Sequence, residues 1–194
     1  MNKTIRLILL VSFLQTALAL TAQYRPVRIF KHGQADARMG IGLLPTYSKD
    51  ASRVVAPPVS VGFDWMAGDV LSIGFTQGYS HYEIEKLWNG DKTIRRYATR
   101  TWQSFFRFAA HYTRTDNLDI YGGMQAGGEF VAIRSVDHAF GPAEALHGIK
   151  PRRFRLQYGA FFGTRFAVSH KLLIWGELGT SISFVQTGIG MKLW

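Results

Sequence analysis

The chain has no cysteine among its 194 residues, which excludes disulfide bonds and a thiol-linked lipid anchor. Long apolar runs are nearly absent as well. The one such run, Leu7 to Leu20, is interrupted by Ser12 and Gln15 and is shorter than the roughly 20 residues that a membrane-spanning helix needs. Any insertion of the remaining chain into a membrane must therefore use strands.

Residues 1–22 have the three-part layout of a secretory signal peptide. Lys3 and Arg6 precede the apolar run, and small residues follow it. Cleavage after Ala19 and cleavage after Ala22 both fit the pattern, and the sequence leaves the choice open. We expect this segment to be removed, and we consider it too short to act as a membrane anchor.

Helical spacing of apolar residues is also lacking beyond residue 36, where a two-residue alternation dominates. The alternation predicts an all-β fold with eight strands, joined alternately by tight turns and by longer polar loops. This pattern indicates an eight-stranded antiparallel up-and-down β-barrel. The predicted strands cover about 37–46, 58–66, 70–86, 94–112, 118–134, 153–168, 172–179 and 182–194.

Alternation does not reveal which face meets water, because a soluble barrel that carries a ligand has an apolar lumen and a polar exterior. Lysine is scarce inside the predicted strands, and only Lys192 sits well within one. The polar face instead combines glycine with mixed charges, and several strands are longer than the usual soluble strand. These features favour a transmembrane barrel with lipid on its apolar face. Aromatic residues near strand ends fit interfacial girdles, with Trp175 either in a girdle or inside the lumen.

The signal-peptide layout and the aromatic end of the last strand resemble small outer-membrane proteins of the OmpA/OmpX type. Trp194 matches the terminal aromatic residue of that family, although Leu193, Met191 and Ile189 alternate out of phase with it. The resemblance implies a location in the outer membrane, insertion by the barrel assembly machinery, and both chain ends in the periplasm. Residues 23–36 would then be a periplasmic N-terminal segment, either a disordered lead or a contact for an envelope protein, and 37–194 the barrel. The Thr-Ala-Gln sequence at 21–23 resembles secreted proteins of the Bacteroidota.

The lumen of an eight-stranded barrel is just wide enough to be filled by side chains. Buried ions in such a space need partners, so we expect a plug of salt bridges, with a proton path or a gated channel as alternatives. Successive residues of a strand point to opposite faces, and we call this alternation strand parity. Parity places these charged residues inside: Arg38, Asp64, Arg107, His111, Asp119, Glu129, Arg153, Arg155, Arg165, Glu177 and Lys192.

The formal net charge of +10 predicts acidic partners. Basic residues gather at one rim of the predicted barrel, which is the extracellular rim if the chain ends lie in the periplasm. There they could bind the phosphates of lipopolysaccharide, or simply form a solvated rim. We expect no nucleic acid partner. The residues concerned are Lys92, Arg95, Arg96, Arg100, Lys150, Arg152 and Arg153.

A lipid A-modifying enzyme is an alternative, because His81 and Glu83 share one face of a predicted strand near this rim. Ser80 points to the opposite face and cannot be their direct neighbour. The His-x-Ser-Asn pattern of the deacylase family is missing, no metal-ligand spacing joins His138 and His147, and no cofactor is implied. The sequence thus predicts an outer-membrane barrel with an envelope-structural or surface-interaction role, with the enzyme and the soluble carrier as alternatives.

Overall fold

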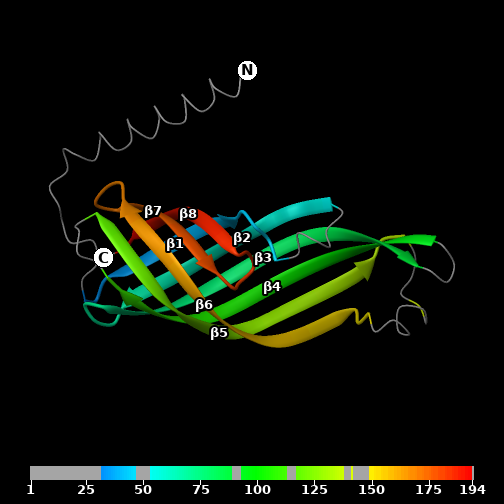
Figure 1. Cartoon of the computed structure of the whole chain (residues 1–194), viewed down its shortest axis with the longest axis horizontal. Coiled ribbons are helices and arrows are strands. Elements are labelled where there is room, and N and C mark those ends of the chain that lie inside the picture. Colours follow the sequence, from blue (N-terminus) through cyan, green and yellow to red (C-terminus); the bar gives the residue numbers. More distant parts are fainter. Residues whose placement is uncertain are drawn as a thin grey trace, which may run out of the picture.

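A computed structural model describes residues 32–46, 53–88, 93–112, 117–137, 141 and 149–193. These residues form one closed barrel in which each strand pairs with the next and β8 pairs with β1, always antiparallel (Figure 1). No helix among them is long and apolar enough to cross a membrane. The strands are β1 (Ala35–Gly42), β2 (Arg53–Met66), β3 (Leu71–Trp88), β4 (Thr93–His111), β5 (Leu118–Ser135), β6 (Arg152–Ala167), β7 (Leu172–Gly179) and β8 (Val185–Lys192).

The predicted fold class is confirmed, and all eight predicted strands are present. The largest difference is β2, which begins at Arg53 and includes Pro57 and Pro58, where the sequence predicts a loop. Proline lacks the N–H that a regular ladder requires, and the register with β3 shifts between Val54 and Val59. This irregular pairing lets the strand continue past both prolines. β1 also starts two residues earlier than predicted, at Ala35, and Trp194 lies outside the described residues.

The barrel wall is uneven in height, because β7, β8 and β1 have eight residues each whereas β2 to β6 have 14 to 19. Tight turns and the C-terminal end lie at one end of the barrel, and the long β3–β4 hairpin projects from the other (Figure 1). At this second end, β6 is paired with β5 from Arg152 onward, but its ladder with β7 covers only Phe161 to Ala167.

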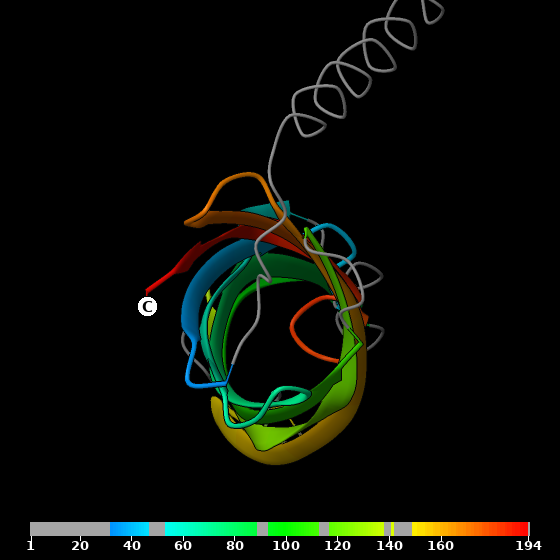
Figure 2. The ribbon, with the colours of Figure 1, turned by 90° about the vertical axis from the view of Figure 1, so that its left-hand side faces the viewer.

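Residues 180–184, the connection from β7 to β8, turn into the space that the strands enclose (Figure 2). Ile182 and Ser183 are buried there. Gly78 leaves room for Ile182, since a Cβ at this glycine would lie 3.2 Å from the Ile182 side chain. Main-chain contacts with the chain after β1 hold the connection in place, including a hydrogen bond from Phe184 N to Leu44 O of 2.8 Å. The connection therefore narrows the lumen partway along the barrel.

The two faces of the wall have opposite character, as the alternation predicts. Large apolar side chains are exposed on the outside, whereas charged and amide side chains are buried inside. Trp102 lies between Tyr79 and Phe130, at ring-centroid distances of 5.4 and 5.9 Å, as in an interfacial girdle. The outward apolar residues include Met39, Ile41, Val59, Val61, Phe63, Ile73, Phe75, Phe106, Phe108, Met124, Phe162, Ile174, Ile189 and Met191.

The inner face also holds aromatic residues that the parity argument did not single out, namely Phe105, Tyr121 and Phe161. Trp175 is among the inward residues too, where its Nε1 donates to Met39 O and Ile189 O at 3.2 Å each. Gly40 makes this position possible, because a Cβ there would lie 2.3 Å from the indole ring. Ring faces and guanidinium groups thus share the lumen.

Candidate functional sites in the lumen and at the rim

Glu177 of β7 is the centre of the first group of ion pairs in the lumen. Arg107 of β4 donates to it twice, from Nη1 to Oε1 at 3.0 Å and from Nη2 to Oε2 at 2.6 Å. Arg38 of β1 donates to Oε2 at 3.1 Å and also lies 3.4 Å from Asp64 Oδ2 of β2. Tyr121 donates a further hydrogen bond to Oε2 at 3.2 Å. This carboxylate therefore joins strands on opposite sides of the barrel.

Arg165 of β6 organises the second group. Its Nη1 donates to Asp36 Oδ2, and its Nε donates to Asp119 Oδ2 at 3.3 Å. The ring of His111 lies between Asp119 and Ser72, with Nδ1 2.8 Å from Asp119 Oδ2 and Nε2 2.7 Å from Ser72 Oγ. Both groups are almost fully buried, so each charge depends on its partners.

Aromatic rings cover the guanidinium groups of this network. The Arg107 guanidinium carbon lies 3.7 Å from the centre of the Phe161 ring, and that of Arg165 lies 4.7 Å from Tyr121. Arg38 lies 5.0 Å from Trp175 in the same way. Cation–π contacts of this kind add stabilisation to desolvated guanidinium groups. The rings and ion pairs lie together in the part of the lumen near the start of β1 and the end of β8.

Glu129 of β5 forms a separate group nearer the other end of the barrel. Its Oε2 accepts from Arg155 Nε at 3.1 Å and from Gln157 Nε2 at 2.9 Å, while Oε1 accepts from Gln103 Nε2 at 3.1 Å. Sequence parity assigns Glu129 and Arg155 to one face of the wall but does not predict which charges pair. It misses Asp36, because the predicted first strand starts one residue later, and it misses Tyr121, whose apolar character hides its polar role.

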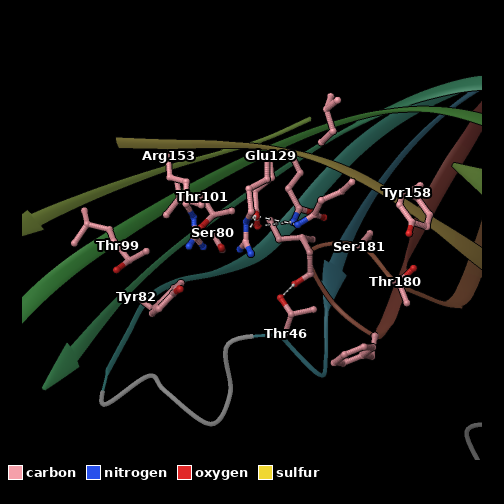
Figure 3. A pocket seen from close by; sticks show the side chains of 18 of the residues that line it. Thr46, Ser80, Tyr82, Thr99, Thr101, Glu129, Arg153, Tyr158, Thr180 and Ser181 are labelled. Carbon is pink, nitrogen blue, oxygen red and sulfur yellow. Dashed lines mark hydrogen bonds and ion pairs between the residues drawn. The ribbon is translucent and has the colours of Figure 1, made fainter. Parts of the chain in front are cut away.

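Beyond the Glu129 group the lumen opens into a cavity of about 600 Å³, which we call the cup. Figure 3 shows Ser80, Tyr82, Thr99 and Thr101 near one end of the cup, and Tyr158, Thr180 and Ser181 near the other. The charged residues that line it are Glu129, Arg153 and Arg155. A second cavity of about 510 Å³ shares Ile84, Thr99 and Ile133 with it.

The basic residues predicted for one rim divide between two faces of the wall. Arg96, Arg100 and Arg152 lie on the outward face of the wall, as the aromatic girdle does. Arg100 is the next outward residue from Trp102 in the direction of the rim. Arg95 and Arg153 have inward parity, and Arg153 lines the cup. Lys150 is exposed before β6, and Lys92 lies outside the described residues. Arg134, which the sequence analysis did not select, is exposed on the outward face of β5.

Arg96 has a carboxylate partner in the chain. Its Nη2 donates to Asp137 Oδ1 at 2.7 Å, and its backbone N donates to Asp137 Oδ2 at 3.1 Å. The hydrogen bonds from Arg96 to Asp137, followed by the charge of that carboxylate, raise the pKa of the guanidinium above its ordinary value. Of the outward arginines, Arg100 and Arg152 are thus better placed than Arg96 to receive an external anion.

The side chains considered for catalysis do not meet. His81 and Glu83 lie on the outward face of β3, where His81 pairs with Arg100 of β4 across the ladder. Ser80 is fully buried on the inward face and lines the cup. The barrel wall therefore separates the serine from the histidine, as strand parity predicts. Among the described residues no cluster of three or more His, Asp or Glu side chains could hold a metal ion; His138 and His147 lie outside them.

Comparisons with known proteins identify the fold. No family model matches the chain, and no curated protein matches it. The outer-membrane protein OprG of Pseudomonas aeruginosa is similar, with 10% sequence identity, 84% of this chain and 97% of that chain covered, and a TM-score of 0.54. Ail of Yersinia pestis, solved in a phospholipid bilayer nanodisc, has 10% identity, coverage of 84% and 100%, and a TM-score of 0.48. The chain has the eight-stranded closed antiparallel barrel of small outer-membrane proteins, and identities this low show the fold alone.

Proposed function

We propose that this protein is an integral outer-membrane barrel whose lumen is closed to solutes and whose outward arginines bind the phosphates of lipopolysaccharide. The observation that carries the proposal is the combination of an apolar outer wall with buried ion pairs inside. A soluble barrel would have the opposite arrangement, because exposed apolar side chains of this number would be costly in water. The role is envelope-structural or surface-interacting, and the signal peptide would direct the chain out of the cytoplasm.

The ion pairs around Glu177 and Arg165 support the proposal of a closed lumen. Their side chains come from six of the eight strands, and the aromatic rings of Phe161, Tyr121 and Trp175 fill the space between them. Eight strands leave little room beyond such side chains. A proton path or a gated channel would require these tightly paired charges to separate, at considerable cost.

The binding of phosphate groups depends on Arg100 and Arg152. Both project outward at the girdle. Arg100 lies one outward position beyond Trp102, and Arg152 lies one outward position beyond Phe154, which pairs with the girdle residue Phe130. At the outer surface of the membrane, this is the height of the lipid headgroups. Arginine pairs with phosphate through two parallel hydrogen bonds, so the outward arginines suit the phosphates of lipid A.

Two experiments test the proposal in sequence. Cell fractionation, followed by electrophoresis of unheated and heated samples in detergent, should give an outer-membrane protein whose mobility changes on heating. A soluble periplasmic protein would contradict the proposal and favour the ligand carrier. Lipopolysaccharide should then bind the protein in phosphatidylcholine nanodiscs. The double variant Arg100→Gln/Arg152→Gln should weaken this binding about tenfold or more, since two charge-assisted contacts are lost.

The matched control is Arg153→Gln/Arg155→Gln, which removes the same charge from the inward face of the wall. It should leave the affinity for lipopolysaccharide nearly unchanged. Equal losses in both variants would mean that the rim attracts phosphate only through its overall charge, and the specific role of Arg100 and Arg152 would be withdrawn.

A further inference from the structure

The cup contains buried polar groups that have no partner in the described part of the chain. The Oγ atom of Ser80 and the Oγ1 atom of Thr99 lack hydrogen bonds, although the two residues are only 0% and 2% exposed. The Oε1 atom of Gln103 is in the same situation, and all three residues line the cup. A buried polar group without a partner is costly, so a ligand that supplies hydrogen bonds would be favoured here.

The charge of the cup favours an anionic ligand. Among the described residues that line it, Glu129 is the one carboxylate, and Arg155, Gln103 and Gln157 already satisfy that carboxylate. Arg153 adds a second positive charge, so the described lining residues have a net charge of +1. Arg153 stands in one row with Thr101 and Ser80 across β6, β5, β4 and β3, because Val131 pairs with both Arg153 and Thr101 and Thr101 pairs with Ser80. A carboxylate or phosphate headgroup could thus contact a guanidinium and hydroxyl groups together.

Apolar residues also line the cup, beside the part of β6 that has no ladder with β7. Leu156 and Tyr158 have outward parity and are 80% and 87% exposed, yet both line the cup. They can do so because the ladder of β6 with β7 begins only at Phe161. Phe184, in the connection from β7 to β8, lines the cup as well. An apolar chain could leave the cup here, beside Phe154, and reach the lipid.

We propose that the cup binds a single-chain anionic amphiphile. The headgroup lies between Arg153, Arg155 and the hydroxyls of Ser80 and Thr99. The chain passes over Leu156 and Tyr158, along the part of β6 that precedes its hydrogen bond with the connection to β8 at Ala160. The volume of about 600 Å³ is within the usual range for small-molecule sites. This site goes beyond the proposed lipopolysaccharide contact, because it uses inward residues and not the outward arginines.

The position of the ligand is tested with dodecanoate that carries a photoreactive diazirine at the end of its chain. The probe is added to the protein, expressed from its full sequence and reconstituted in phosphatidylcholine nanodiscs, and the crosslinked residues are mapped by mass spectrometry. Crosslinks should concentrate on Leu156, Tyr158 and Phe184. Labelling spread evenly over lipid-facing residues such as Phe106 and Met124 would overturn the proposal, because it would show mere partitioning into the bilayer.

The affinity is tested with dodecanoate, dodecyl phosphate and dodecanol. The two anions should bind, and whichever binds more tightly identifies a carboxylate or a phosphate as the natural headgroup. Arg153→Gln/Arg155→Gln should weaken anion binding about tenfold or more. Equal binding of dodecanol and dodecanoate would overturn the proposal.

Two further variants distinguish loss of binding in the cup from a folding defect and from binding at the outward arginines of the rim. Ser80→Ala/Thr99→Val keeps every charge and should weaken binding about fivefold, since only hydrogen bonds are lost. Arg100→Gln/Arg152→Gln should leave binding of the amphiphile unchanged, whatever it does to lipopolysaccharide binding. Unchanged anion affinity in both cup variants, with a heat-modifiable band that shows correct folding, would overturn the proposal.

Discussion

Individual residues in the lumen are held by partners from distant strands, and Glu177 shows how much depends on one carboxylate. It accepts hydrogen bonds from Arg38, Arg107 and Tyr121. Glu177→Gln should lower the free energy of unfolding by about 3 kcal/mol, because the buried Arg107 guanidinium loses its charged partner and Arg38 keeps only Asp64. Urea titration in lipid vesicles, followed by tryptophan fluorescence, measures this loss. Glu83→Gln, on the outward face, should change it by less than about 0.5 kcal/mol, and equal effects would contradict the prediction.

His81 and Glu83 allow a residue-level test of the enzyme alternative. Their outward position places the barrel wall between them and the buried Ser80. His81→Ala/Glu83→Ala should therefore leave the lipid A of expressing cells unchanged in its mass-spectrometric profile. A lost acylation or deacylation product in the double variant, with normal protein abundance, would instead support a lipid A-modifying activity.

At the scale of elements, the β3–β4 hairpin extends well beyond the girdle. Glu85 pairs with Arg96 and Lys86 pairs with Arg95, whereas β4 begins to pair with β5 only at Tyr97. Deletion of residues 85–96, with an Asn-Gly turn in their place, should leave barrel formation intact because the shared ladders remain. The heat-dependent change in mobility should persist with a nearly unchanged midpoint. Its loss would mean that barrel closure requires the projecting hairpin.

The predicted strands agree closely with the observed ones because each strand has one apolar face and one polar face. Such a strand gives a direct two-residue alternation in the sequence. β3 to β7 match within two residues at each end. β2 differs because bulges absorb two prolines, and a bulge depends on the partner strand. The part of β6 without a ladder to β7 follows from the short length of β7, β8 and β1, yet the predicted ranges of the first and eighth strands were too long to reveal it.

At the scale of the whole molecule, a charge placed on the outer face of the wall tests whether that face contacts lipid. Met124 is 68% exposed on the outside, between Phe108 and Ala160 of the neighbouring strands. Met124→Arg should destabilise the barrel in lipid vesicles by about 2–4 kcal/mol, as expected for a charge near the bilayer midplane. Denaturant titration in the same vesicles measures this change.

Ile94→Arg is the matched control, because Ile94 is also exposed but lies on the projecting hairpin. Its effect should stay within about 0.5 kcal/mol. Tolerance of arginine at both positions would indicate that water contacts the apolar wall, and the membrane assignment would be wrong.

The sequence by itself determined the barrel and its strand number, because local alternation encodes both. The scarcity of lysine and the glycine and mixed charges of the polar face, and not the alternation, indicated which face is inward. The sequence also placed most of the lumen charges, since parity assigns each of them to a face. Only the tertiary structure decided which charges pair, because Arg38 and Glu177 lie 139 positions apart and meet through closure of the barrel. The inward turn of residues 180–184 and the cup beside β6 likewise arise from unequal strand lengths around a closed ring. Such features depend on pairing between distant segments, which local periodicity does not record.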